Sequence, residues 1–134
     1  MPIIRKHQKF DGVFFSGSKQ QQKIYTANAD KGRTIYGEKI VEDGDIEYRD
    51  WNPYRSKLAA AILNNCRNIY ISKNSYVLYL GASSGTTVSH FSDIITKGVI
   101  YSVEFSPRSL RELVQNCVDR KNIIPILGDA NRPF

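Results

Sequence analysis

Cysteine is scarce in this sequence. The two cysteines, Cys66 and Cys117, form no CxxC pair and no Cys/His cluster. We therefore expect reduced thiols in an intracellular protein, and neither a disulfide nor a metal site. No apolar run is long enough to span a bilayer, and the N-terminus shows no signal peptide, so we expect no membrane partner.

Acidic residues are few relative to basic ones. The 134 residues include 19 Lys+Arg against 13 Asp+Glu, which gives a formal net charge of +6. This excess favours a polyanionic partner, although many basic proteins bind no nucleic acid. Hydrophobic residues make up 41% of the chain, which is enough for a packed core and excludes a wholly disordered protein.

The first fifty residues alternate short β-like runs with turn signals. The Asp43-Gly44 step between two of these runs is a strong hairpin signal. Together the runs predict a small antiparallel β domain of about four strands over residues 1–50. The expected strands lie within Gly12–Phe15, Lys23–Thr26, Ile35–Val41 and Ile46–Arg49.

A helix is expected after this domain. Asn52 is a good N-cap, and Pro53 at the first helical position loses no hydrogen bond. Strong helix formers continue from Arg55 to Leu63, with Leu58 and Ile62 on the buried face.

A glycine loop between a strand and a helix organises the rest of the chain. The apolar run Tyr76–Leu80 enters the loop Gly81-Ala82-Ser83-Ser84-Gly85, and Val88, Phe91 and Ile95 then recur at helical spacing. Strand, tight turn and helix N-terminus form the first unit of a nucleotide-binding α/β sheet. A side chain at Gly81 or Gly85 would hold a ligand away from the backbone.

Two further βα units are expected. The pattern predicts a strand over Val99–Val103 that ends on Glu104, a helix from Pro107 to about Arg120, and a strand over Ile123–Leu127. Pro125 places this last strand at a sheet edge because proline cannot donate to a ladder. The inward residues of the second helix are expected to be Leu110, Leu113, Val114 and Cys117.

The loop spacing bears on which cofactor is bound. The middle glycine of the dinucleotide pattern G-x-G-x-x-G is missing, which disfavours NAD. Glu104 closes the second parallel strand, where a carboxylate can accept both hydroxyls of a ribose. Asp129 closes the third, where an adenine amino group could donate to it. An adenosine-type cofactor without a pyrophosphate, S-adenosylmethionine, fits this pattern.

In these segments the sequence resembles the archaeal fibrillarin-like RNA 2′-O-methyltransferases. The resemblance covers most of residues 35–134 and implies a Rossmann-like α/β methyltransferase sheet, of which residues 51–134 form the first half. The matching segments are Tyr48–Pro53, Arg55–Leu58, Leu78–His90, Val103–Arg108 and Asn122–Ala130.

The resemblance also implies roles for individual residues. Thr86 and Thr87, after the loop Gly81, Ala82 and Gly85, contact the methionine part of the cofactor. The ribose and adenine contacts fall to Glu104, Phe105, Asp129 and Ala130. Lys57 matches the first member of the family's catalytic group, and its ammonium would stabilise the alkoxide that develops on a 2′-hydroxyl.

Other side chains have simpler explanations. Without the resemblance, Lys57 is an ordinary lysine in the first turn of a helix. His90 is expected to be a partly buried helix residue and not a base. Trp51 and Tyr54 are expected to pack at the domain junction and not to stack on bases.

The implied partners are those of a guide-RNA-directed methyltransferase subunit. They are a box C/D guide RNA, a target rRNA or tRNA, a Nop-domain scaffold protein and a kink-turn-binding ribosomal-type protein. The expected location is cytoplasmic for an archaeal protein and nucleolar for a eukaryotic one. The family's later catalytic residues come from strands beyond Phe134, so we expect an N-terminal segment that is inactive alone. Two alternatives remain: a methyltransferase of another substrate, and a non-catalytic cofactor-binding or assembly module.

Overall fold

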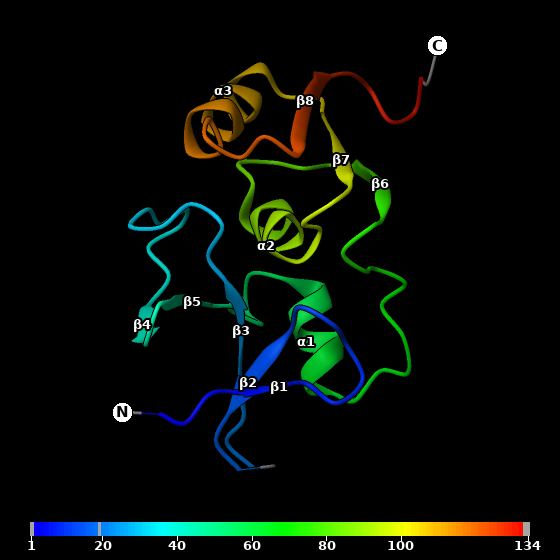
Figure 1. Cartoon of the computed structure of the whole chain (residues 1–134). Helices are drawn as coiled ribbons and strands as arrows, with labels where there is room; N and C mark the ends of the chain where they lie inside the picture. Colours follow the sequence, from blue (N-terminus) through cyan, green and yellow to red (C-terminus); the bar gives the residue numbers. More distant parts are fainter. Residues whose placement is uncertain (1, 19, 133–134) are drawn as a thin grey trace.

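Two β-sheets lie on opposite sides of one helix. The computed structural model describes residues 2–18 and 20–132. In it, helix α2 (Thr86–Ile94) contacts strand β3 (Lys23–Ala27) of an antiparallel sheet and strand β7 (Val99–Glu104) of a parallel sheet (Figure 1). The expected fold class is confirmed: a small antiparallel β unit precedes the start of a Rossmann-like sheet.

The antiparallel sheet has five strands, one more than expected, in the order β1-β2-β3-β5-β4. Its Asp43–Ile46 hairpin is confirmed, with Gly44 at a φ of 61°. Besides β3, its strands are β1 (Arg5–Lys6), β2 (Phe14–Ser16), β4 (Ile40–Asp43) and β5 (Ile46–Asp50).

The strand expected over Ile35–Val41 is wrong in its first half. The Glu38 carboxylate accepts hydrogen bonds from the backbone N–H groups of Ile35 and Tyr36, and the chain wraps around it instead of joining a ladder. The pairing therefore begins only at Ile40.

The parallel sheet follows the order β6-β7-β8, with β6 spanning Tyr76–Leu80 and β8 spanning Ile123–Leu127. Pro125 sits in β8, which pairs only with β7 within the described residues, so its expected edge position is confirmed. Helices α2 and α3 (Pro107–Asn116) provide the crossovers between consecutive strands.

Two helix limits differ from the sequence prediction. Helix α1 spans Lys57–Leu63 and begins after Ser56, whose hydroxyl accepts from the N–H of Ala59. The side chain of Asn52 instead accepts from the N–H of Tyr54 in the turn before the helix. Helix α3 ends at Asn116, short of the expected Arg120.

The exposure of three side chains also differs from the sequence prediction. Val114 was expected to face inward but is 44% exposed, and Leu113 is the buried residue of α3. His90 is buried completely, more than expected, and Trp51 stacks on it as junction packing. Tyr54 was expected to pack at the same junction, but it is 97% exposed.

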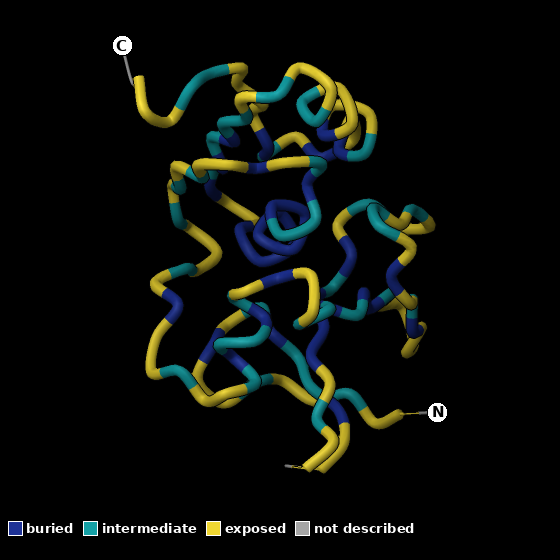
Figure 2. Tube along the Cα trace, turned by 180° about the vertical axis from the view of Figure 1, so that it is seen from behind, coloured by how far each residue is buried: buried dark blue, intermediate teal, exposed yellow. Residues whose placement is uncertain are grey.

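Helix α2 is buried on nearly all sides, and it forms the dark-blue coil at the centre of Figure 2. Its polar residues are satisfied by a buried ionic network. Asp93 accepts from Arg49 of β5 (2.9 Å) and from Arg120 (2.6 Å), and Arg49 also binds Glu38. These contacts connect the antiparallel sheet, through α2, to the segment between α3 and β8.

The network shifts its members' pKa values. Burial works to lower the pKa of Arg49, but the carboxylates of Asp93 and Glu38 outweigh it and raise that pKa. Burial, with the positive charges of Arg49 and Arg120, lowers the pKa of His90 well below its usual value. A neutral His90 accordingly shares hydrogen bonds with the hydroxyls of Thr26 (2.7 Å) and Tyr36 (2.6 Å).

Within residues 2–18 and 20–132, no helix combines the length and apolarity needed to cross a membrane. In the same residues, no three His, Cys, Asp or Glu side chains gather as metal ligands. Cys66 and Cys117 are both free thiols, and burial raises the pKa of Cys117 to about 11.

Candidate active site

The glycine loop after β6 bends over the end of β7. The N–H groups of Gly81 and Ala82 both donate to the carbonyl of Val103 at 2.9 Å. Gly81 has a φ of 84°, and a Cβ built on it would meet no protein atom within 4 Å. Glycine is therefore needed here for its backbone conformation, and the space beside it is open to a ligand.

Gly85 has a different role from the one expected. It caps α2 at a φ of 99°, but a Cβ on it would lie 2.9 Å from Cδ1 of Leu113 and 3.1 Å from Sγ of Cys117. The residue thus allows α3 to approach the start of α2. Its missing side chain faces the core and not a ligand.

The Glu104 carboxylate is held in place by the backbone. Its Oε1 accepts from the N–H of Ser83 at 2.7 Å, and its Oε2 accepts from the N–H of Ser106 at 2.9 Å. A carboxylate has about four acceptor sites. Two therefore remain for hydroxyl groups of a ligand at the end of β7.

A pocket of about 390 Å³ adjoins Glu104. Phe105 lies on its wall with 69% of its surface exposed, and Asp129 accepts from the N–H of Asn131 with its Oδ1. The pocket runs along the ends of β6, β7 and β8, where open parallel sheets bind ligands. It is lined by Gly81, Val103, Glu104, Phe105, Gly128, Asp129, Ala130 and Asn131.

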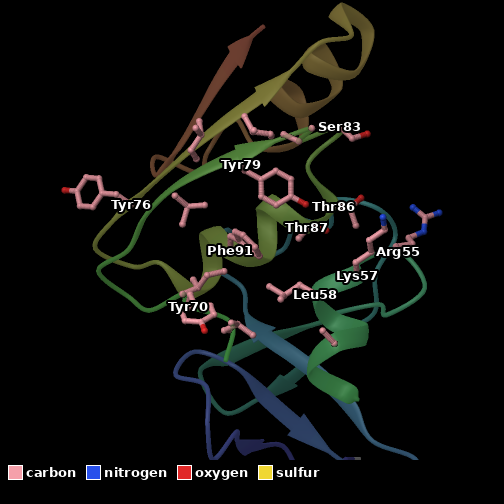
Figure 3. A pocket seen from close by; sticks show the side chains of 18 residues that line it. Arg55, Lys57, Leu58, Tyr70, Tyr76, Tyr79, Ser83, Thr86, Thr87 and Phe91 are labelled. Carbon is pink, nitrogen blue, oxygen red and sulfur yellow. The ribbon is translucent and has the colours of Figure 1, made fainter. Parts of the chain in front are cut away.

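A second pocket, of about 950 Å³, shares Gly81 with the first and is lined by Ala82 as well. Lys57 from α1 lines it together with Thr86 and Thr87 from the start of α2. Figure 3 shows the Lys57 side chain directed toward Thr86 at one end of the pocket. Among the described residues no carboxylate pairs with Lys57, so its ammonium is available to a ligand.

The structure therefore brings together nine of the ten candidate residues around these two pockets, with Gly85 behind them in the core. Sequence reasoning missed two contacts that build the site. The Ser83 N–H orients Glu104, and the Thr87 hydroxyl donates to Ser56 at 3.2 Å, which ties the start of α1 to the start of α2. The only sequence signal for the second contact was the serine directly before Lys57, a good N-cap residue.

The family model described as Fibrillarin matches residues 4–134. The chain belongs to the fibrillarin family. Among the curated relatives, the fibrillarin-like rRNA/tRNA 2′-O-methyltransferase of Methanosarcina barkeri is 53% identical over 133 residues, covering 99% of this chain and 57% of the relative. The protein of the same name from Pyrobaculum islandicum is 50% identical over 135 residues, covering 98% and 57%.

Solved fibrillarins share the fold. The chain superposes on Aeropyrum pernix fibrillarin, crystallised with natively bound S-adenosyl-L-methionine, with a TM-score of 0.91 and 44% identity, covering 97% of this chain and 58% of that one. A crystal structure of a fibrillarin/Nop5p complex matches with a TM-score of 0.71 and 47% identity, covering 83% and 50%. The chain thus spans between 50% and 58% of the length of these relatives.

Proposed function

We propose that this chain supplies the cofactor site and the first catalytic lysine of an S-adenosylmethionine-dependent RNA 2′-O-methyltransferase. The observation that carries the proposal is the alignment of Gly81, Glu104 and Asp129 along one edge of the parallel sheet. Gly81 also lines the larger pocket, which Lys57 lines from α1. Curated relatives at about half identity bear the name of this activity on rRNA and tRNA, which supports the substrate class.

The residues present fit S-adenosylmethionine. Gly81 leaves open space at the loop, and Glu104 keeps acceptor sites for ribose hydroxyls. Helix α2 has no side-chain cap at Gly85, so its first N–H groups are free to receive the carboxylate of the methionine part near Thr86 and Thr87. The smaller pocket offers Phe105, Asp129 and Ala130 to the adenine.

When bound, this cofactor supplies an electrophilic methyl group. A ribose 2′-hydroxyl is a weak nucleophile, and negative charge develops on its oxygen as its proton leaves. The Lys57 ammonium stabilises that charge and orients the oxygen at the rim of the larger pocket. The helix start that carries Lys57 is held against the cofactor loop by the Thr87–Ser56 hydrogen bond.

The proposed setting is a box C/D guide RNA–protein complex. In it, base pairing between guide RNA and target selects the nucleotide, a Nop-domain scaffold protein positions this subunit, and a kink-turn-binding ribosomal-type protein completes the particle. The solved fibrillarin/Nop5p complex supports the scaffold partner.

Calorimetric titration with S-adenosylmethionine tests the cofactor site. Replacing Glu104 with alanine should remove two charge-assisted hydrogen bonds of about 1.5–3 kcal/mol each before water compensates, so affinity should fall at least tenfold. Glu112→Ala on the exposed side of α3 is the matched control. Equal affinity of the two variants would exclude the ribose assignment, and NAD should not bind to the unmodified protein.

A second candidate is a cofactor-binding or assembly module without its own catalysis. The face of the parallel sheet opposite α2 supports it, because Tyr76, Leu78 and Leu80 of β6 are more than half exposed there. Cofactor binding without methyl transfer in the assembled complex would favour this candidate.

A further inference from the structure

Tyr54 is the most exposed large hydrophobic side chain in the part of the chain that the structure describes, at 97%. It lies between two buried residues, Trp51 at 0% and Ser56 at 2% exposure. The chain is thus buried on both sides of a short turn, and this turn presents the Tyr54 ring to solvent. An exposed tyrosine offers an apolar ring face and a polar hydroxyl to a ligand.

The turn that carries Tyr54 is rigid. The N–H of Arg55 donates to the carbonyl of Asn52 at 3.2 Å, and the side chain of Asn52 accepts from the N–H of Tyr54 at 2.8 Å. Pro53 fixes the backbone between them.

Both ends of the turn are anchored in the core. On one side Trp51 stacks on His90 with ring centroids 5.0 Å apart. On the other, Ser56 receives the hydrogen bond from Thr87. The backbone under Tyr54 is thus ordered before any ligand arrives, which reduces the entropy lost on binding.

Two cations, Arg55 and Lys57, lie one and three residues after Tyr54 in the sequence. Arg55 and Lys57 both line the larger pocket, and Figure 3 shows them together at the end that holds Thr86. The Arg55 guanidinium lies 5.6 Å from the centroid of the Tyr36 ring, a cation–π contact that stations it at the rim. An exposed aromatic ring that is followed in the sequence by two pocket-lining cations matches a single-stranded nucleic acid, whose bases stack and whose phosphates attract positive charge.

We propose that Tyr54 is a stacking platform for an unpaired base of the RNA substrate, adjacent to the nucleotide whose ribose faces Lys57. The inference rests on the proposed function and adds a substrate contact to it. An apolar protein partner would need further apolar side chains around the ring, whereas the next residues in the sequence that line the pocket are Arg55 and Lys57.

The test is a titration of the purified protein with a short unstructured RNA that carries 2-aminopurine, whose fluorescence is quenched by stacking. Wild-type protein should quench it. Tyr54→Leu, which keeps an apolar side chain without a ring, should raise the Kd for the RNA about tenfold and abolish the quenching. Tyr54→Trp should keep both the wild-type affinity and the quenching. The matched control is Tyr76→Leu, an exposed tyrosine at the opposite end of the pocket in Figure 3.

The outcomes separate the inference from the proposed function. If Tyr54→Leu binds and quenches like Tyr76→Leu, Tyr54 is not a stacking platform, although methyl transfer can still be intact. If Tyr54→Leu loses only the binding of a scaffold protein and keeps RNA binding, the ring serves a protein partner and the inference is wrong. If the wild type binds S-adenosylmethionine but not the RNA, the inference fails. If the full-length protein, assembled with a guide RNA, also fails to methylate RNA, the proposed substrate class fails with it.

Discussion

Asp93 of α2 joins the antiparallel sheet to the segment that precedes β8, so its replacement should destabilise the whole chain. Its Oδ1 accepts from Arg120 and from the N–H of Ala29, and its Oδ2 accepts from Arg49 and from the hydroxyl of Thr26. All four contacts are between 2.6 and 2.9 Å, and the Asp93 side chain is fully buried. Asp93→Asn keeps the volume but removes the charge and places an amide donor among four donors.

The cost follows from what is left behind. Arg49 keeps Glu38, but within the described residues Arg120 has Asp93 as its only carboxylate partner. Leaving a buried charge without its partner costs about 3–5 kcal/mol, a large part of the about 5–15 kcal/mol that holds a typical domain folded. With a urea m-value of about 2 kcal/mol/M, the unfolding midpoint should fall by about 2 M.

Urea unfolding followed by circular dichroism measures this shift, and two variants sharpen it. Asp119→Asn removes an exposed carboxylate 3.6 Å from Arg33 and should cost less than about 1 kcal/mol. Adding Arg120→Met to Asp93→Asn removes the uncompensated charge and should recover part of the stability. Equal midpoints for Asp93→Asn and Asp119→Asn would refute the reasoning.

Two further predictions concern catalysis and pH. In the full-length protein, Lys57→Ala should slow single-turnover methyl transfer to a guided RNA by about 10²-fold or more, while cofactor affinity changes less than twofold. The exposed Lys73→Ala is the control, and loss of cofactor affinity at a normal rate would instead make Lys57 a binding residue. Burial holds the pKa of His90 well below its unfolded value of about 6.5, so on acidification the unfolded chain binds a proton before the folded chain does. The free energy of unfolding should therefore fall as the pH drops below about 6.5, by up to about 1.4 kcal/mol per pH unit. Burial also lowers the pKa of His7, so the test uses a His7→Gln background. In that background His90→Gln should flatten the pH dependence of the free energy of unfolding, measured at pH 7, 6 and 5. An unchanged slope would assign the pH dependence to other groups.

Much of the cofactor site could be predicted because its geometry follows from local pattern. Once three βα units are read from the sequence, right-handed crossovers and a parallel sheet bring the ends of β6, β7 and β8 to one edge. Gly81, Glu104 and Asp129 each lie at or within two residues of a strand end, so their proximity can be predicted without knowledge of distant contacts.

The remaining features depend on residues far apart in the sequence. Gly85 belongs to the core because Leu113 packs over it, and Glu38 folds its own loop because it meets Arg49. Asn52 has every local mark of a helix N-cap, yet Ser56 takes that role, since it is buried against Thr87 of another helix.

The amino-acid sequence by itself determined the βα order, the strand ends and the family, because these depend on periodicity and short motifs. Only the tertiary structure decided which polar groups were buried in pairs and that the Tyr54 ring stayed exposed while Trp51 was buried. Asp93 and Arg120 can be buried only because they form an ion pair with each other, although they lie far apart in the sequence. Tyr54 is held in solvent because Trp51 and Ser56, on either side of its turn, are buried. Such pairings are properties of the packed chain, where desolvation makes an unpartnered charge costly, and no local stretch of sequence contains them.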